Sequence, residues 1–289
     1  MTGTGTQTDP YIVDNISDLL SAISNAGAYV ALDPNSANKV IDFNDNPKWY
    51  TETPFVFACK YLNGNGWSIR NVMVKNCNFL QLAYTTYTTI ENLNIESAYI
   101  LSTNTGGNIY VLSVPNSDTG SSKLTLKNCK ISAVLDALLG NISFSYVRRA
   151  NMFAYNCSFN VTLKNNAVIN STDIWENCNI IVNGNSSQGT PLSFDVLDTC
   201  KISGNLICTY LSTLVITLTS SSSYNVIDFE LIGKSNTDIS IRNYGKTLVN
   251  TDKLKGFNNI NLSDSTCGVT SSQMIDADYL NSIGFMIGE

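Results

Sequence analysis

The chain has 289 residues, a net charge of −6 and no histidine. Its few arginines and acidic balance leave no basic stripe for tracking phosphates, so we expect no nucleic-acid partner. Without an imidazole, the commonest acid–base centres and His-ligated metal sites are excluded. Only 14% of the residues are charged, whereas 37 are Asn, and the scarcity of strong helix formers beside abundant β-branched residues favours an all-β protein.

The N-terminal segment, residues 1–10, is polar and rich in Gly and Thr, which is not typical of a secretory signal peptide. No run of about 20 apolar residues exists, so we expect no membrane insertion. The next segment has apolar residues at helical spacing, with Asp14 or Asn15 in position to cap it. These residues predict a helix over residues 14–25.

A short phrase then recurs along the chain, clearest in LTLKNCKI, MFAYNCSF and DIWENCNI. Its core is Asn, then Cys or Leu, then any residue, then Ile or Phe, and the clear copies are roughly 20 to 28 residues apart. The residues that we assign to the second position of the phrase are Cys77, Leu93, Cys129, Cys157, Cys178 and Cys200.

Each phrase alternates apolar and polar residues, as a short strand does. Asn tolerates the left-handed backbone region best among non-glycine residues, so it can turn the chain sharply between two strands. About three strands of 4 to 5 residues would then make one coil. We predict an all-β fold, a single right-handed parallel β-helix with a short helix at each end. In it the six assigned residues form an inward core stack and the Asn amides a ladder.

Two alternatives accompany this prediction. The phrase also matches part of the leucine-rich repeat consensus, but the spacing is irregular and the intervening segments are not helical. The eight cysteines would form disulfides in an oxidising setting. Because most of them share one position in the repeat, we favour buried thiols, and no C-x-x-C pair indicates a metal site.

The C-terminal segment carries the second helix signal. Thr270 and Gln273 are spaced as a capping box, and Gly284 lies where a helix would end, which predicts a helix over residues 271–283. The predicted organisation is an N-terminal segment with its capping helix over residues 1–55, the β-helix over residues 56–265 and a C-terminal capping segment over residues 266–289.

The repeated I-x-x-N-C-x-I phrase resembles the pectin-lyase-like right-handed parallel β-helix superfamily over about residues 56–262. The two ends of the chain resemble those of β-helical proteins of bacteriophage virions and bacterial surfaces. Enzymes of the superfamily act on acidic polysaccharides, and its hydrolases carry four short motifs. Asn236-Thr237-Asp238 spells one of them, the others are absent, and we interpret the match as a turn. The resemblance implies a fold and no activity.

Glycoside hydrolysis needs two carboxyl groups that face each other across a sugar. Asp195 and Asp198 are the nearest such pair in sequence, and neighbouring coils could add Asp173 or Glu176. We interpret all four as residues of turns and solvated faces. The sequence therefore predicts no catalytic residue, no cofactor and no metal.

Exposed side chains could still contact a glycan or a protein partner. Tyrosine rings stack on sugars and anchor interfaces, and guanidinium groups bind carboxylates or sulfates bidentately. The candidate contact residues are Tyr84, Tyr87, Tyr99, Tyr110, Arg148 and Arg149.

The function that we expect is that of a non-catalytic structural or adhesive protein on the tail or capsid surface of a bacteriophage virion. Its partners would be other virion proteins and host-surface glycan. A homotrimer is compatible with this role, although no coiled-coil segment would enforce one. The alternatives are a polysaccharide lyase or glycoside hydrolase of the tailspike type, and a bacterial surface adhesin.

Overall fold

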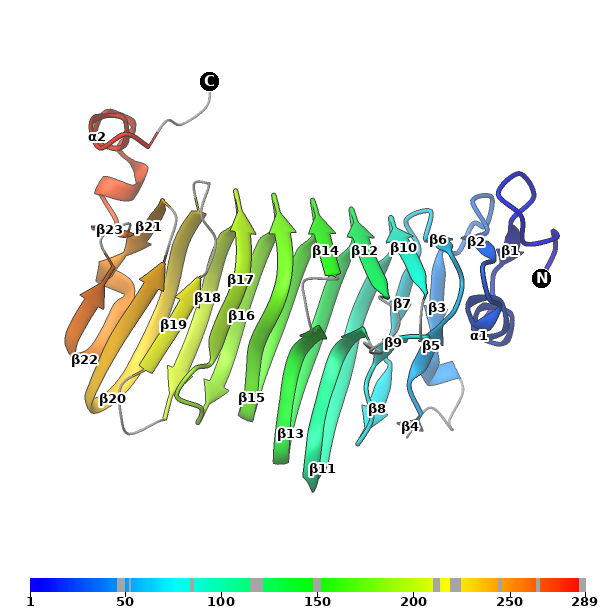
Figure 1. Ribbon diagram of the computed structural model, residues 1–289, viewed down its shortest axis with the longest axis horizontal. Helices are drawn as coiled ribbons and strands as arrows, with labels where there is room; N and C mark the ends of the chain where they lie inside the picture. Colours follow the sequence, from blue (N-terminus) through cyan, green and yellow to red (C-terminus); the bar gives the residue numbers. More distant parts are fainter. Residues whose placement is uncertain are drawn as a thin grey trace.

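The computed structural model describes residues 1–45, 50–51, 53–83, 86–114, 122–147, 152–209, 214–218, 225–243, 246–263 and 266–285. It is a parallel β-solenoid of about 7 turns, with 62% of the residues in strands and 10% in helices. The described strand-to-strand pairings are parallel, and each joins a strand to its counterpart in the neighbouring coil (Figure 1). The all-β, parallel β-helix prediction is confirmed.

Successive coils stack corresponding strands along the solenoid. The strands that precede the Asn turn are β1 (Tyr11–Val13), β2 (Tyr29–Leu32), β6 (Tyr61–Asn63), β10 (Tyr87–Glu91), β12 (Lys123–Lys127) and β14 (Met152–Tyr155), followed by the ends of β15 (Ser158–Glu176) and β17 (Leu192–Asp198). The strands that follow the turn are β3 (Val40–Asp42), β7 (Ser68–Arg70), β11 (Asn94–Val114), β13 (Lys130–Val147), β15, β16 (Asn179–Ser186), β18 (Lys201–Cys208) and β20 (Asn225–Asn243). The remaining strands are β4 (Tyr50–Thr51), β5 (Phe55–Phe57), β8 (Met73–Lys75), β9 (Leu80–Leu82), β19 (Leu214–Leu218), β21 (Thr247–Asn250), β22 (Leu254–Leu262) and β23 (Thr266–Val269).

The expected boundary at residue 55 does not interrupt the strand pairing. On its N-terminal side β1 pairs with β2, and β2 pairs with β6 on the other side. In the same way β3, β4 and β5 pair with β7, β8 and β9. The first coils therefore include residues that the sequence assigns to the N-terminal segment. The three domain boundaries expected from the sequence stay predictions.

In four successive coils an Asn residue makes the turn between the first two strands. Asn92, Asn128, Asn156 and Asn177 have φ angles of 54°, 52°, 51° and 52°, in the left-handed region that Asn tolerates. Their amides bond along the stack: Asn128 Nδ2 donates to Asn92 Oδ1 at 3.3 Å, and Asn177 Nδ2 to Asn156 Oδ1 at 2.6 Å. The next coil has Thr199 at this position with a φ of 51°.

The residue after each turn points into the core. The structure stacks Leu93, Cys129, Cys157, Cys178 and Cys200, each at most 3% exposed. Cys178 N–H donates to the sulfur of Cys200 at 3.4 Å. No disulfide joins the eight cysteines, and burial raises the pKa of Cys59 and of Cys208 to about 12.

Cys77 requires a correction, because it does not belong to this stack. Asn94 pairs with Ser68, so the residue beneath Leu93 is Trp67, which is 1% exposed. The Trp67 Nε1–H donates to the Asp33 carbonyl at 2.8 Å. Cys77 instead follows β8, at a later corner of the coil, and is half-buried. The sequence phrase around Cys77 resembles the repeat, but strand register assigns it to another corner.

Aromatic side chains fill the interior beside the thiol stack. Phe159 and Trp175 have ring centroids 4.4 Å apart, and Phe144 and Phe194 meet the Trp175 ring at 5.8 Å and 5.7 Å. All four are at most 1% exposed. The interior is therefore a packed, dry core rather than a channel.

The N-terminal end is covered by α1 (Ile16–Ser24), as predicted. The Asn15 side chain accepts a hydrogen bond from Asp18 N–H, so Asn15 is the N-cap. Leu19, Ala22 and Ile23 of α1 are buried in the main core.

The C-terminal helix is shorter than the predicted span of residues 271–283. Thr270 and Gln273 do form the reciprocal capping box, but it opens a 3-10 turn, Gln273–Ile275. The Asp276 side chain then caps α2 (Ala277–Ser282), which ends before Gly284 with a φ of 78°. The segment packs on Leu248 and Val269 in a small cluster separate from the main core, and α2 projects above that end of the solenoid (Figure 1).

Candidate functional site

A cavity of about 270 Å³ opens at one corner of the solenoid, where successive coils use turns of unequal length. Lys75 pairs with Leu101 and Leu80 with Leu112, so one coil spans this corner with residues 76–79 and the next with residues 102–111. The longer corner belongs to β11, which together with β13 reaches lower than its neighbours in Figure 1. Residues 102–111 extend beyond the shorter turn of residues 76–79, and the space between these two segments is the cavity.

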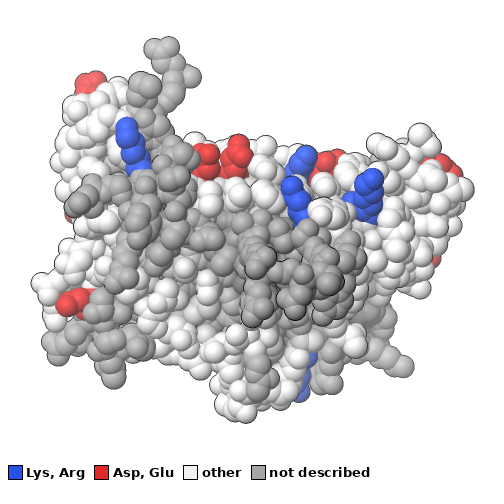
Figure 2. Space-filling model, in the orientation of Figure 1, with Lys and Arg blue, Asp and Glu red and all other residues white. Residues whose placement is uncertain are grey.

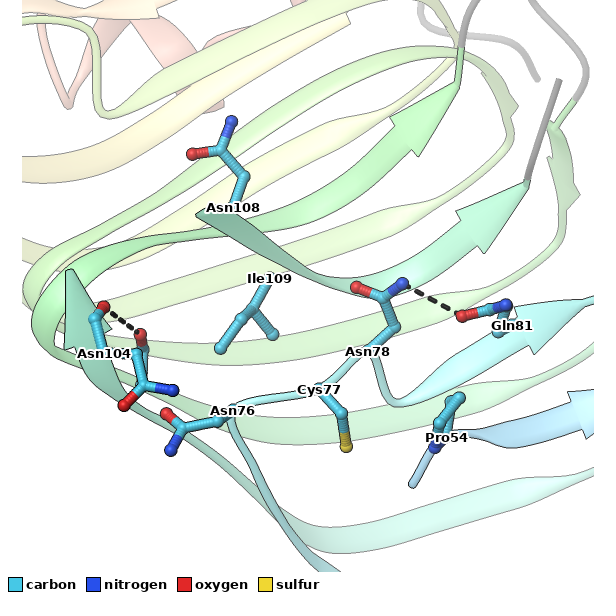
Figure 3. A pocket seen from close by; sticks show the side chains of 9 residues that line it. Pro54, Asn76, Cys77, Asn78, Gln81, Asn104, Asn108 and Ile109 are labelled. Atoms are coloured by element: carbon cyan, nitrogen blue, oxygen red, sulfur yellow. Dashed lines mark hydrogen bonds between the residues drawn. The ribbon is translucent and has the colours of Figure 1, made fainter. Parts of the chain in front are cut away.

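Neutral amides dominate the lining, and an apolar wall completes it. Ser102 also faces the cavity, and none of the nine described lining side chains is charged. The lining residues are Pro54, Asn76, Cys77, Asn78, Gln81, Ser102, Asn104, Asn108 and Ile109. Figure 3 shows the side chains of Asn76, Cys77, Asn78, Asn104 and Ile109 close to one another at this corner, with the amide of Asn108 pointing away from Ile109.

Some of these amides hold the fold together. The Asn76 Oδ1 accepts from Thr103 N–H at 2.8 Å, while its Nδ2 donates to Thr103 Oγ1 at 3.0 Å. The Asn78 Oδ1 accepts from Tyr110 N–H at 3.0 Å, and its Nδ2 donates to Gln81 Oε1 at 3.1 Å. These bonds fix the rim of the cavity before any ligand arrives.

Other polar groups remain available to a ligand. Among the described hydrogen bonds, none engages the Nε2 group of Gln81 or the side chain of Asn104, although the Asn104 carbonyl accepts from Ser102 Oγ at 3.5 Å. Among the same described bonds, the side chain of Asn108 accepts one long bond, from Asn141 Nδ2 to Oδ1 at 3.5 Å. The cavity therefore offers neutral donors and acceptors beside the apolar side chains of Pro54 and Ile109, a chemistry suited to an uncharged polar ligand.

The three candidate tyrosines that the structure describes do not gather into one surface. Tyr87 is 57% exposed on β10, whereas Tyr99 and Tyr110 are half-buried on separate stretches of β11. The Tyr99 hydroxyl donates to Asp136 Oδ2, and burial together with this bond raises the pKa of Tyr99 to about 12. Of these three, Tyr110 adjoins the cavity, through its backbone N–H, which donates to Asn78 Oδ1. Tyr84, Arg148 and Arg149 lie outside the described residues.

The carboxylates considered for hydrolysis are only partly described. Glu176 and Asp198 are Cα partners in register on neighbouring strands, whose backbones lie about 4.8 Å apart along the stack. Both point outward, and neither lines the cavity. The side chains of Asp173 and Asp195 lie outside the described ones. Asn236-Thr237-Asp238 is no turn but lies at an irregularity within β20, where Asp238 accepts from Asn259.

The described surface has few charged side chains and no cluster of metal-binding side chains. The charged side chains visible in Figure 2 gather mainly along the upper rim, where β10, β12, β14 and β17 end in Figure 1. Among the described residues, no cluster of three or more Cys, Asp or Glu side chains could hold a metal ion. Within the same part of the chain, no helix is long and apolar enough to cross a membrane.

The sequence interpretation missed the cavity residues. Asn is so abundant that Asn76, Asn104 and Asn108 do not stand out, and Gln81 sits in an ordinary strand. The one usable signal was the gap between Leu93 and Cys129, which is longer than the gaps between later copies of the phrase and indicates an enlarged coil.

Comparisons with known proteins identify no family. No protein-family model matches the chain, and no curated protein matches it. The chain is similar to a solved structure from Bacteroides ovatus that carries the provisional name immunoglobulin A1 protease, with 14% identity and a TM-score of 0.48. The match covers 98% of this chain and 90% of the other. A similarity of this size carries no argument about activity, and membership of the pectin-lyase-like superfamily stays a prediction.

Proposed function

We propose that the protein is a non-catalytic structural and adhesive protein of a bacteriophage virion surface, and that it binds host-surface glycan in the amide-lined cavity. Its other partners are neighbouring virion proteins. The observation that carries the glycan-binding part is the uncharged lining, with the amides of Gln81 and Asn104 available beside an apolar wall. Neutral amide groups recognise sugar hydroxyls without the cost of burying a charge.

The virion assignment is supported by the resemblance of the chain ends and by the stacked architecture. A solenoid with a dry interior and few charges is a stiff spacer that can display a side pocket to solvent. The absence of histidine from the sequence supports a non-catalytic role.

A glycan microarray probed with the whole purified chain tests binding. We expect defined glycans to be retained, and Gln81→Ala and Asn104→Ala to weaken retention at least tenfold. Asn160→Ala is the matched control, because Asn160 is an exposed amide on β15 away from the cavity. Binding unchanged by both cavity variants would overturn this site. Mass spectrometry of purified phage particles tests the virion location, and absence of the chain from every particle would refute it.

Polysaccharide cleavage is a second candidate function, favoured by the in-register pair Glu176 and Asp198. Retaining glycosidases need carboxyl groups about 5 Å apart. Release of reducing ends from a host polysaccharide, abolished by Glu176→Gln, would establish it and refute the non-catalytic proposal. No release with the glycans that the array identifies supports the non-catalytic proposal.

A further inference from the structure

We infer that the sugar held in the amide-lined cavity is a neutral N-acetylhexosamine, bound with its acetamido methyl against the apolar wall. This inference rests on the proposed glycan-binding function and names the class of sugar. Its starting point is the mixed character of the lining, in which amides and apolar side chains face the same small space (Figure 3).

The neutral lining selects against acidic sugars. A uronate or sialate carboxylate requires a cation, commonly a bidentate guanidinium, to offset its desolvation. None of the nine described lining residues is Lys or Arg, and none is acidic. A neutral sugar is the class that this set of groups accepts.

The available amides match an acetamido group. An acetamido group has one N–H donor and one carbonyl acceptor, which point to opposite sides of its trans amide, so two different amide side chains can meet them, one as acceptor and one as donor. Asn104 has both atoms available among the described hydrogen bonds, and the Nε2 group of Gln81 supplies a further donor. A plain hydroxyl uses the same groups, so the amides alone do not separate the two sugars.

The apolar wall makes the distinction. Pro54, Cys77 and Ile109 contribute carbon and sulfur surface to the same cavity, and Ile109 itself is 7% exposed. At C2 a hexose places a hydroxyl against this wall and leaves it without a partner there, whereas the acetamido methyl of an N-acetylhexosamine removes apolar surface from water. Burial of one methyl favours binding about fourfold, and avoiding an unpaired hydroxyl adds a comparable factor.

The volume fits a single ring. About 270 Å³ lies just below the range of roughly 300 to 1,000 Å³ that holds drug-sized ligands. One pyranose with one substituent occupies such a space, and a longer glycan continues outward over the corner. The terminal or branching residue is therefore the one recognised.

Titration calorimetry of the full chain with three methyl glycosides tests the inference: N-acetyl-β-D-glucosaminide, β-D-glucoside and β-D-glucuronide. We expect the first to bind at least tenfold more tightly than the second, and the third not to bind. Gln81→Ala should weaken N-acetylglucosaminide binding about tenfold, and Asn160→Ala should leave it unchanged. Cys77→Ser should shrink the preference over glucoside, because it makes the wall polar.

The failures of the two proposals are distinguishable. Equal binding of glucoside and N-acetylglucosaminide, both lost in Gln81→Ala, would overturn the acetamido inference and leave glycan binding intact. Tighter binding of the glucuronide than of the N-acetylglucosaminide would also overturn the acetamido inference and leave glycan binding intact. Loss of all three, together with a blank glycan microarray for a chain whose circular dichroism is native, would overturn both.

Discussion

Thr199 occupies a turn position where the preceding coils have Asn, and it is less suited to the left-handed conformation there. Replacing Thr199 with Asn should therefore stabilise the protein. Thr199 holds a φ of 51° at the position where neighbouring coils have Asn156 and Asn177. The left-handed backbone conformation destabilises a non-glycine residue by about 1 to 2 kcal/mol. The cost is greatest for a β-branched residue such as Thr and smaller for Asn. The Thr199 hydroxyl offsets little of this cost, because its hydrogen bond to Asp198 Oδ1, at 3.2 Å, is exposed to solvent and contributes little stability.

The expected gain for Thr199→Asn is about 1 kcal/mol from relieved strain. A new amide can also extend the ladder by donating to Asn177, as Asn177 donates to Asn156. For a domain of this size, about 1 kcal/mol corresponds to a rise of roughly 2 to 4 °C in the melting temperature. The reverse change, Asn177→Thr, should destabilise by about 2 kcal/mol, because it adds strain and removes that hydrogen bond.

Urea unfolding followed by circular dichroism measures both changes. Thr125→Asn is the matched control: Thr125 lies on β12 outside the left-handed region, so Asn there should be neutral or slightly destabilising. A Thr199→Asn variant no more stable than the wild type, with Asn177→Thr equally silent, would refute the turn argument. Equal gains from Thr199→Asn and Thr125→Asn would show that backbone strain is not the cause.

Three further predictions follow from the core, the ion pairs and the thiols. Phe159→Asp, at a side chain 0% exposed, should cost several kcal/mol by burying an unpaired charge, measured as a loss of the urea midpoint. Burial alone would raise the pKa of Asp228, but hydrogen bonds from Lys253 and Asn250 outweigh it and lower that pKa. Its stabilisation is therefore complete above the usual Asp pKa near 4 and is lost as the pH falls through the lowered value, so Asp228→Asn should destabilise at pH 7 and much less near pH 2. A thiol reagent should label the half-buried Cys77 and Cys267 in the native protein before the other cysteines, as peptide mapping would show.

Each of these has a control and a contrary outcome. Asn160→Asp introduces the same charge on the exposed side of the Phe159 strand and should be nearly neutral; equal losses would contradict the interior assignment. A stability difference for Asp228→Asn that does not change with pH would contradict the ion-pair reasoning. Uniform labelling of all cysteines in the native state would contradict the dry thiol stack.

The repeat phrase was sufficient to predict the fold because its information is local. Alternation assigns each side chain to one face, and Asn at a fixed place marks the turn, as Asn128 and Asn156 show. The N-terminal helix was also predictable, since its cap, Asn15, and its apolar face lie within a few residues of each other. The C-terminal helix was overestimated, because its capping box opens a 3-10 turn instead.

The cavity could not be predicted in the same way. Its lining comes from three coils, and it exists because residues 76–79 and residues 102–111 span the same corner. Corner length has no local signature in a chain so rich in Asn and Thr. The misplacement of Cys77 has the same cause, since a matching phrase does not say which corner of the coil it occupies.

By itself, the amino-acid sequence determined that this protein is a stack of short parallel strands with small apolar groups inside, because alternation and turn preference act between neighbours in the chain. Only the tertiary structure decided that Trp67 lies beneath Leu93 and that neutral amides meet at one corner. Both depend on strand register between coils, which joins residues about 20 to 40 positions apart and is set by how much chain each corner consumes.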